Sequence, residues 1–144
     1  MHRFSKKSLE RLDDINPVLL NVLLEGIKES PYDFGIPRDG GKRTHKRQCE
    51  LYAKGRTTDK LISKGIEGIE GRPNESKITW TLNSCHNTGN AFDIYAYVDG
   101  KASWSREYLE PIARHLQKVA LSQGVILQWG YDLWKKDAAH FQIS

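Results

Sequence analysis

Two segments of the chain hold the residue types that bind a catalytic metal ion. One contains His86 and Asp93, and the other contains Asp137 and His140. Two imidazoles and one carboxylate are a common ligand set for zinc in hydrolases, where a fourth position stays open for water. The bound metal lowers the pKa of that water to about 7, and a carboxylate that is not a ligand can then accept its proton. With Asp137 in that last role, these residues predict a metal-dependent hydrolase.

The sequence around His86 predicts a β-hairpin that brings two of the ligands together. Residues 77–82 and 91–98 are rich in β-forming side chains, and residues 87–90 favour a turn. In such a hairpin His86 and Asp93 lie on the same face, diagonally opposed and roughly 7–8 Å apart at the backbone, within reach of one ion. For this pair considered alone, a hairpin whose histidine and aspartate simply face water is the alternative.

The end of the chain predicts a strand over residues 140–143. His140 and Gln142 would share one face of this strand, because side chains alternate along it. Asp137 has the opposite parity and falls in the turn before the strand, from where we expect it to reach over the metal without binding it. Asp132 is the rival for this role, although the interpretation we favour for Asp132 is that of a turn residue.

Motifs along nearly the whole chain carry a family resemblance. In the C-terminal half they are Ser84-x-His86-x-x-Gly89-x-Ala91-x-Asp93, Trp129-Gly130 and Asp137-x-x-His140-Phe141. In the N-terminal half they are Phe4-Ser-x-x-Ser8-Leu9, Phe34-Gly35, Lys42-Arg43-Thr44 and Gln48-x-x-Leu51-Tyr52-Ala53-x-Gly55-Arg56-Thr57. With these motifs the chain resembles the zinc peptidase family of D-Ala-D-Ala carboxypeptidases and dipeptidases, and more closely its phage branch, the L-alanyl-D-glutamate endopeptidase endolysins.

The resemblance implies a role for each of five residues. In the family, the residues that match His86, Asp93 and His140 bind Zn²⁺. The residue that matches Asp137 is the catalytic acid and base. The residue that matches Arg43 lies in the substrate site and steadies the developing oxyanion.

Three further residues are candidates for contact with the substrate. Gln48 belongs to the N-terminal motif that carries the resemblance. Ser84 could bond the substrate, or it could serve the local turn or strand. Trp129 could form a wall of the substrate groove, and a place in the hydrophobic core agrees with the sequence equally well.

The apolar pattern predicts an α+β fold, in which an antiparallel sheet carries the zinc site and helices pack on it. We expect helices over residues 17–29, 44–54 and 104–122, and a short strand within residues 124–130. Residues 58–76 predict a mobile loop that is longer than the usual connection in the family. The side chains expected to face the core are Leu19, Leu20, Leu23, Leu24 and Ile27 in the first helix, and Leu109, Ile112, Leu116 and Val119 in the last.

The composition is that of a small, basic, folded protein. The chain has 144 residues, of which 38% are hydrophobic, and a formal net charge of +4 at pH 7. One core suffices for this length, so we expect a single catalytic domain over residues 1–144, monomeric and without a separate cell-wall-binding domain. No apolar run reaches the roughly 18 residues that span a membrane, which argues against membrane insertion.

The beginning of the chain lacks the apolar core of a signal peptide, because a polar segment follows the first basic residues. We therefore expect the protein to stay in the host cytoplasm until lysis and then to act on the cell wall. Its substrate would be bacterial peptidoglycan. A membrane-permeabilising partner would have to release it.

Basic residues gather at residues 42–47 and again at Lys54 and Arg56. The interpretation we favour is a charged, solvent-exposed face of the helix predicted over residues 44–54. Attraction to an anionic cell envelope is a second interpretation. Nucleic-acid binding is the weakest, because the chain lacks the interleaved aromatic and basic residues of single-strand binders.

The chain has two cysteines, Cys49 and Cys85, and no Cys-x-x-Cys pair. We expect both to be reduced in a cytoplasmic protein. A nucleophilic Cys85 with a histidine base is an alternative mechanism. However, alternation along the predicted strand turns His86 away from Cys85, so a small buried apolar cysteine is favoured.

We therefore predict a zinc peptidase that cuts the L-Ala-D-Glu bond of peptidoglycan stem peptides, as a phage endolysin does. The basic residues 42–47 could line a groove for the carboxylates of such a substrate. Three alternatives remain: a D-Ala-D-Ala carboxypeptidase of the same family, a metal-binding module without catalysis, and a basic nucleic-acid-binding protein.

Overall fold

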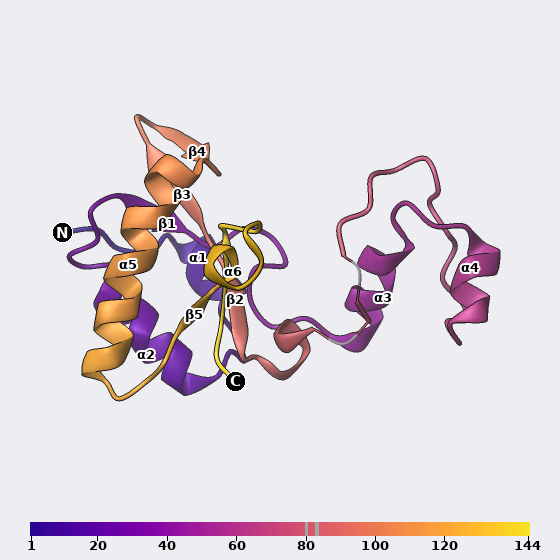
Figure 1. The fold of residues 1–144 in the computed structure, drawn as a ribbon, viewed down its shortest axis with the longest axis horizontal. Coiled ribbons are helices and arrows are strands. Elements are labelled where there is room, and N and C mark those ends of the chain that lie inside the picture. The colour runs from indigo at the N-terminus through magenta and orange to yellow at the C-terminus, as the bar shows by residue number, and fades with distance from the viewer. Residues whose placement is uncertain (80, 83) are drawn as a thin grey trace.

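The fold comes from a computed structural model that describes residues 1–79, 81–82 and 84–144. Figure 1 shows a larger part, which includes both chain ends, and a smaller part that carries α3 and α4. We call the larger part, residues 1–44 and 84–144, the body. The smaller part, residues 45–79 and 81–82, is the lobe.

Several of the helices begin where a side chain caps the first turn. Asn16 accepts a hydrogen bond from the Val18 amide at 3.0 Å, and Pro17 occupies the first helical position. Thr44 likewise accepts from the Arg47 amide at 3.1 Å. The α-helices of the described residues are α1 (Lys6–Arg11), α2 (Pro17–Gly26), α3 (His45–Ala53), α4 (Thr58–Ser63), α5 (Arg106–Ser122) and α6 (Gly130–Trp134), and η1 (Cys85–Thr88) is a 3-10 helix.

The strands form two antiparallel sheets of three strands each. The first sheet has the order β1 (Asp33–Gly35), β3 (Tyr95–Val98), β4 (Lys101–Ser103), and the second has the order β2 (Ala91–Asp93), β6 (His140–Gln142), β5 (Gln128–Trp129). In the second sheet Asp93 lies directly opposite His140. Together with the helices, these sheets confirm the predicted α+β fold.

The body has one large hydrophobic core between its helices and sheets. Helices α2 and α5 pack side by side, as Figure 1 shows, and β2 packs against β6. Across that strand pair the rings of Phe92 and Phe141 stack with their centroids 5.0 Å apart. The core includes Leu19, Leu23, Phe34, Ile94, Leu109, Ile112, Leu116 and Trp129. Burial of these side chains supplies the main stabilising free energy and holds the second sheet in place.

The lobe has a separate and much smaller hydrophobic cluster. Its buried members are Cys49, Tyr52, Ala53, Leu61 and Ile66, with Ile69 and Leu82 packed against them. This cluster joins α3 to α4 and to the loop that follows. The prediction of a loop over residues 58–76 is therefore wrong for residues 58–63, which form α4.

Two predicted strands are corrected by the structure. Within the predicted strand 77–82 no strand is present in residues 77–79 and 81–82, and Trp80 lies outside the described residues. The strand predicted over residues 91–98 is two strands, β2 and β3, which belong to different sheets. The chain passes from one sheet to the other at Ile94, whose amide donates to the Ala139 carbonyl oxygen. Side chains that alternate on a single strand cannot reveal such a change of sheet.

Some boundaries and the burial of some side chains also differ from those predicted. Helix α2 ends at Gly26, and Leu24, which was expected to face the core, is 40% exposed. In the segment 124–130 only Gln128–Trp129 is a strand. Leu20 and Val119, expected to face the core, pack at its margin as partly buried residues.

Among the residues that the structure describes, no helix has the length and apolar character needed to cross a membrane.

Candidate metal centre

The three predicted ligands come from three different elements of the body. His86 lies on η1, Asp93 on β2 and His140 on β6. The hairpin expected to join His86 to Asp93 is not how they meet, because residues 77–79 and 81–82 form no strand and η1 (Cys85–Thr88) overlaps the expected turn. Gly89 ends η1 with a positive φ of 77°, and β2 then pairs with β6. Strand pairing thus brings Asp93 and His140 together, and η1 adds His86.

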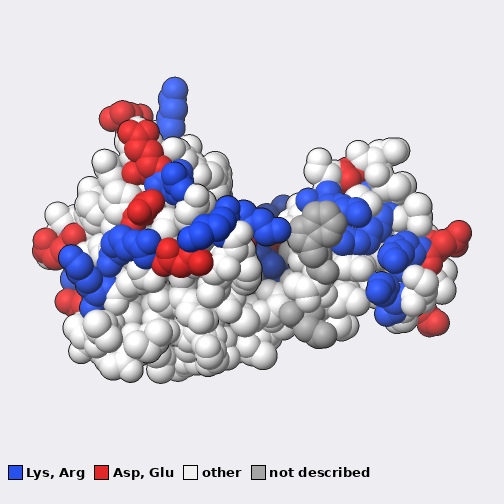
Figure 2. Space-filling view, in the orientation of Figure 1, with Lys and Arg blue, Asp and Glu red and all other residues white. Residues whose placement is uncertain are grey.

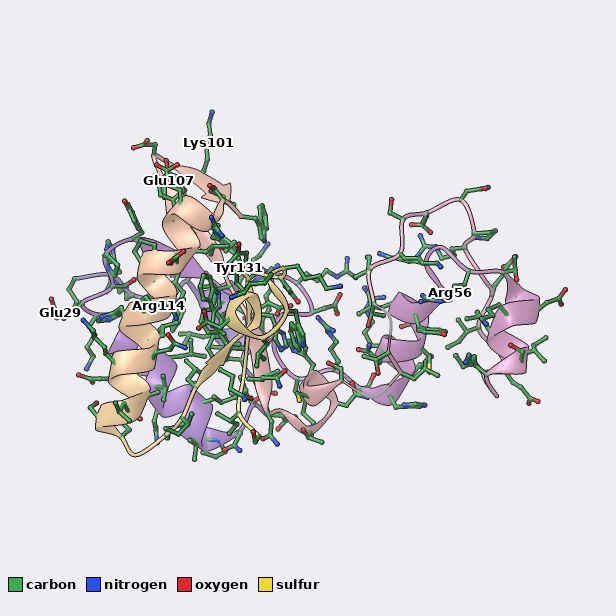
Figure 3. All side chains as sticks on the ribbon, in the orientation of Figure 1. Glu29, Arg56, Lys101, Glu107, Arg114 and Tyr131 are labelled. Carbon is green, nitrogen blue, oxygen red and sulfur yellow. The ribbon has the colours of Figure 1, made fainter. Side chains whose placement is uncertain are left out.

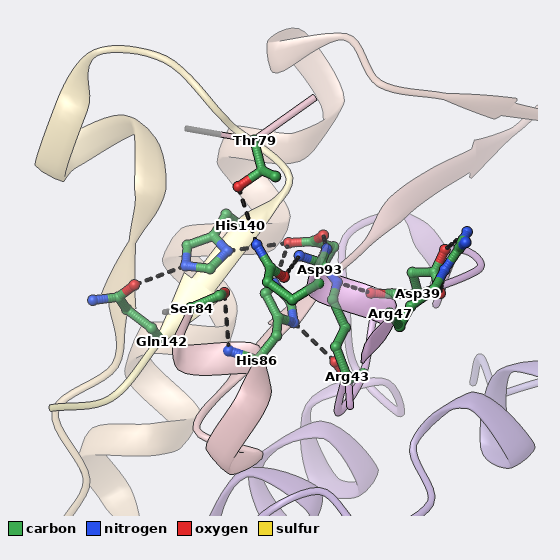
Figure 4. Close-up of polar contacts among 11 residues, drawn as sticks. Asp39, Arg43, Arg47, Thr79, Ser84, His86, Asp93, His140 and Gln142 are labelled. Carbon is green, nitrogen blue, oxygen red and sulfur yellow. Dashed lines mark hydrogen bonds and ion pairs between the residues drawn. The ribbon is translucent and has the colours of Figure 1, made fainter. Parts of the chain in front are cut away.

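The ligand atoms converge on one point. His86 Nε2 is 3.3 Å from Asp93 Oδ1, and His140 Nδ1 is 3.2 Å from the same oxygen. Each residue offers one ligand atom, and all of these atoms lie within 4.8 Å of one another. Both imidazoles are buried, with 2% and 6% of their residue surface exposed. Figure 4 shows the three side chains facing one another. They could hold a metal ion.

Backbone and side-chain acceptors fix the orientation of both imidazoles. His86 Nδ1 lies 2.9 Å from the Gly41 carbonyl oxygen, and His140 Nε2 lies 2.8 Å from Gln142 Oε1. Each acceptor favours the tautomer that carries its proton on the outer nitrogen, which leaves a lone pair on the nitrogen that faces Asp93. The donor set therefore fits a metal ion. The shared face of His140 and Gln142 was visible in the sequence, but the role of Gln142 was missed.

Gly41 is a glycine for a steric reason. A β-carbon on it would lie 2.0 Å from the Arg11 carbonyl oxygen. This clash could not be relieved by a side-chain movement, because the oxygen belongs to the backbone. The loop that carries the His86 acceptor is therefore pressed against the C-terminal end of α1. This close approach, which no sequence motif indicates, fixes the ring of His86.

The Asp93 carboxylate is ionised by its surroundings. Burial alone would raise its pKa, but hydrogen bonds from His140 and His86 and the charges of both rings hold the pKa of Asp93 well below its ordinary value. Asp93 Oδ2 also accepts from Arg43 NH2 at 3.3 Å. The same Asp93 charge raises the pKa of His140 above its usual value, although burial opposes that shift. A cation at this point would take the place of these protons.

Arg43 links the metal site to the lobe. Its Nε donates to the Asp39 carbonyl oxygen at 2.9 Å and its NH1 to Gln48 Oε1 at 3.3 Å, in addition to the NH2 bond with Asp93. The side chain is 13% exposed. Three bonds to three elements hold the guanidinium plane in one orientation.

Gln48 is fully buried on α3 and does not line the pocket. Its Nε2 donates to Thr79 Oγ1 at 3.1 Å and to the Thr81 carbonyl oxygen at 2.8 Å, while its Oε1 accepts from Arg43. Gln48 was a candidate for substrate contact. The structure instead places it behind the pocket, where it ties Arg43 to the segment around Thr79 and Thr81.

The metal residues lie on the wall of a pocket of about 580 Å³ between the body and the lobe. The lining residues are Arg43, Ile78, Thr79, Thr81, Ser84, Cys85, His86, Asp93, Trp134, Lys136, Asp137, His140 and Gln142. Ser84 lines the pocket and also accepts a hydrogen bond from the His86 amide at 3.1 Å. Trp134, which the sequence did not indicate, also lines the pocket, and the centroid of its ring is 5.4 Å from that of the His140 ring. The pocket therefore offers space for a substrate beside the three candidate ligands.

Asp137 lines the same pocket from the turn before β6, as its parity predicted. Its backbone has a positive φ of 60°, and its carbonyl oxygen accepts from the His140 amide at 3.2 Å. The residue is exposed to solvent, yet the protein around its carboxyl group desolvates it, and this desolvation and the charge of Asp93 raise the pKa of Asp137. Asp137 is not one of the three convergent ligands among the described residues.

The rival candidates lie elsewhere. Asp132 forms a two-bond ion pair with Arg114 on the surface, at 2.6 and 2.9 Å. Trp129 is fully buried and donates to the Ala138 carbonyl oxygen, so the structure has it in the core and away from the pocket. Figure 3 labels Arg114 beside α5, on the outer side of the body.

The cysteines show no arrangement for nucleophilic chemistry. Burial raises the pKa of Cys49, which disfavours its thiolate, although its Sγ lies 3.5 Å from His45 Nε2. Cys85 lines the pocket, but no histidine of residues 1–79, 81–82 and 84–144 is hydrogen-bonded to its Sγ. Metal chemistry thus has a better-formed site than cysteine chemistry.

Fold and site together define a class. A small α+β protein with two oriented histidines, an ionised carboxylate and a second carboxylate beside an open pocket has the arrangement of a metal-dependent hydrolase. Comparison with known proteins makes the assignment specific. The profile of the family described as "Phage L-alanyl-D-glutamate peptidase" matches residues 1–143. The chain belongs to this family of peptidases.

Two relatives agree with this assignment over almost the whole chain. The L-alanyl-D-glutamate peptidase of Escherichia phage T5 is 28% identical over 143 residues, which cover 99% of this chain and 89% of the phage protein. The crystal structure of the Serratia marcescens L-Ala D-Glu endopeptidase ChiX superimposes with a TM-score of 0.72 at 27% identity. That match covers 99% of this chain and 91% of the Serratia chain.

Proposed function

We propose that this peptidase hydrolyses the L-Ala-D-Glu bond of peptidoglycan stem peptides, with Zn²⁺ held by His86, Asp93 and His140. The observation that carries the proposal is the convergence of the three ligand atoms within 4.8 Å on a pocket wall. Two nitrogens and one oxygen are ligands that zinc accepts, and the pocket side leaves a position for water and substrate. Family membership supplies the bond that is cut.

Asp137 acts as the proton carrier of this reaction. When bound, zinc makes water acidic and polarises the carbonyl of the scissile bond. Asp137 takes a proton from the attacking water and returns it to the nitrogen of the leaving amine. Its raised pKa makes the protonated form easier to reach, which suits a group that must both accept and donate a proton.

Arg43 stabilises the developing oxyanion from a position that three hydrogen bonds hold fixed. One N–H of NH1 and one of NH2 are used by Gln48 and Asp93, which leaves the second N–H of each nitrogen. Arg43 lines the pocket. We therefore assign it to the developing negative charge of the substrate carbonyl, and we assign the Ser84 hydroxyl, whose oxygen accepts from His86, to donation toward the substrate backbone.

The site of action follows from this substrate. A peptidoglycan hydrolase made in the host cytoplasm reaches the cell wall only after the membrane has been opened. We propose a membrane-permeabilising partner for this step and a monomeric enzyme thereafter. Detection of wall fragments only after the membrane of producing cells has been permeabilised would support this order.

The test of the proposed chemistry is digestion of purified peptidoglycan by the unmodified protein and by Asp137→Asn. Fragments that begin with D-Glu, with L-Ala left on the glycan, are the expected products. Asp137→Asn should keep one equivalent of zinc and lose roughly 10²- to 10⁴-fold in turnover. Asp132→Asn, at the surface ion pair, should retain full turnover.

Two results would contradict the proposal. Turnover of Asp137→Asn close to that of the unmodified protein would remove the proton-carrier role. Release of single D-alanine as the main product would make the chain a carboxypeptidase, with the ligand assignment intact.

A further inference from the structure

Two consecutive lysines after α6 lie in different surroundings. Lys135 has a positive φ of 56°, and its Nζ lies 5.8 Å from the centre of the Tyr131 ring. Lys136 instead lines the pocket, immediately before Asp137. The left-handed turn at Lys135 separates the two side chains. Figure 3 labels Tyr131 at α6, where Lys135 lies.

Lys136 is the available cation of the pocket. Among the residues that the structure describes, no carboxylate lies within ion-pair distance of its ammonium group. The second cation of the pocket, Arg43, already bonds to Asp93, Gln48 and the Asp39 carbonyl. Figure 2 shows Lys and Arg side chains in a band that extends from above α6 towards the lobe. An anionic group that enters the pocket would therefore meet Lys136 as an unpaired charge.

The basic residues expected to line the groove do not do so as a group. Of residues 42–47, Arg43 alone lines this pocket. Arg47 does not line the pocket and is paired with Asp39 at 2.8 Å and Glu50 at 3.7 Å. The cationic lining predicted from residues 42–47 is thus supplied by Arg43 and by Lys136, a residue that no sequence motif singled out.

The substrate of the proposed reaction brings a carboxylate to this place. In a stem peptide D-Glu continues the chain through its γ-carboxyl group, so its α-carboxylate stays free on the carbon next to the scissile nitrogen. Of the two carboxylates of the pocket, Asp93 would be neutralised by the proposed metal ion, whereas Asp137 remains as a negative charge that repels such a group. A substrate with this charge therefore needs a compensating cation on the pocket wall.

We propose that Lys136 binds the α-carboxylate of the D-Glu residue and makes the enzyme specific for D-Glu over its amide, D-isoglutamine. The inference rests on the proposed function, since it assumes cleavage before D-Glu. The ammonium group makes a strong charge-assisted bond to the carboxylate and only a weaker hydrogen bond to the carbonyl oxygen of the neutral amide, so discrimination follows from one contact. Lys136 acts here as a specificity-determining residue.

The test compares two soluble disaccharide pentapeptides that differ only in D-Glu or D-isoglutamine at the second position, each with lysine as the third residue and D-Ala-D-Ala at the end. The remaining carboxylate, at the terminal D-Ala, is common to both, so a difference reports on the α-carboxylate alone. The unmodified protein should cleave the D-Glu form with a kcat/KM roughly 10- to 100-fold higher. Lys136→Met should reduce cleavage of the D-Glu form by a similar factor and leave the D-isoglutamine form within about 3-fold.

Two further variants make the comparison specific. Lys136→Arg keeps the cation and should retain the preference, while Lys135→Met, next to it but outside the pocket, should leave both rates unchanged. Equal loss on both substrates in Lys136→Met, or a preference that persists in it, overturns this inference while the proposed function stands. Release of D-alanine in place of fragments that begin with D-Glu overturns the proposed function and this inference together.

Discussion

The body and the lobe contribute to the same pocket in different ways. The body holds all three candidate ligands on elements that are packed into its large core, with Phe92 and Phe141 stacked beneath Asp93 and His140 on neighbouring strands. The lobe has a small cluster around Leu61 and contributes pocket wall without contributing a ligand. The residues proposed to hold a metal ion thus lie on the better-packed part, which suits a site of fixed geometry.

The connections between the two parts are polar. Asp39 of the body pairs with Arg47 of α3, and Arg43 bonds to Gln48 on the same helix. Polar contacts at a partly exposed boundary contribute little stability individually, whereas a buried apolar core contributes much. We therefore expect the body to determine metal binding and global stability, and the lobe to influence substrate handling and to open locally.

Loss of a body ligand should have the largest effect. His140→Ala removes one of the three proposed ligand atoms, so the affinity for zinc should fall. Loss of a residue that only supports a ligand typically lowers metal affinity by roughly 10- to 100-fold, and we expect a larger decrease here. The same change at His45, an exposed histidine of the lobe, should leave one equivalent of zinc per chain. Metal analysis of both purified variants gives the comparison. A full equivalent of zinc in His140→Ala would show that the ligand set is wrong.

Core truncation should separate the two parts in stability. Leu109 and Leu61 are both 0% exposed, the first in the body core and the second in the lobe cluster. Leu109→Ala should lower the free energy of unfolding of the whole protein by about 2–5 kcal/mol, because it leaves a cavity in the main core. Leu61→Ala should act locally, with faster amide exchange in α3 and α4 and little change in the body.

The measurement is hydrogen exchange by mass spectrometry beside denaturant unfolding. Equal loss of protection in body and lobe after Leu61→Ala would mean that the two parts unfold as one unit. Metal content serves as a further readout, and it should be unchanged in Leu61→Ala.

Local patterns predicted the chain-end half of the site. Alternation over residues 140–143 and the parity of Asp137 need only the geometry of one strand and its preceding turn, and both agree with the structure. His86 was assigned to the ligand set by motif and resemblance, but its hairpin was wrong. The same Asn-Thr-Gly sequence that suits a hairpin turn also suits a 3-10 helix ended by Gly89.

What the sequence could not show depends on distant residues. The pairing of β2 with β6 sets Asp93 opposite His140 across 47 positions, and no local pattern encodes that register. Gln48 looked like a pocket residue because it lies in a motif. Its burial follows from contact with Thr79 and Thr81, which come from another part of the lobe. The periodic pattern of apolar residues along the sequence does not show burial that results from contacts between distant residues.

Gln48 should show how much the lobe matters to the site. Gln48→Met keeps a similar volume and removes the amide, so the Arg43 N–H that donates to Gln48 loses its partner, at about 1–3 kcal/mol for a buried group left unpaired. We expect kcat/KM to fall roughly 10-fold, which 1.4 kcal/mol would produce, with zinc content unchanged. Lys46→Met, an exposed change on the same helix, is the matched control. Loss of metal in Gln48→Met would contradict the separation of roles.

The ion pair between Asp39 and Arg47 should have the smallest effect and a defined pH dependence. Hydrogen bonds to Arg47, at 3.0 and 2.8 Å, lower the pKa of Asp39 below its ordinary value near 3.8, and the charges of Arg47, Arg43 and Arg38 act in the same direction against desolvation. A lowered pKa in the folded state means that the pair stabilises the protein above about pH 4. The contribution is lost as pH falls through the folded-state pKa.

Asp39→Asn tests this pair with little backbone strain, because Asp39 has a positive φ of 62° and asparagine tolerates that conformation well. The two side chains are 29% and 24% exposed, so the loss should be about 0.2–1 kcal/mol near pH 6, seen as faster exchange in α3. The difference between unmodified and variant protein should become smaller as the pH falls below about 4. Asp132→Asn, which breaks the more exposed pair with Arg114 in the body, should leave exchange in α3 unchanged. A difference in α3 that persists undiminished at pH 3 would mean that the charge of Asp39 is not what holds α3 to the body.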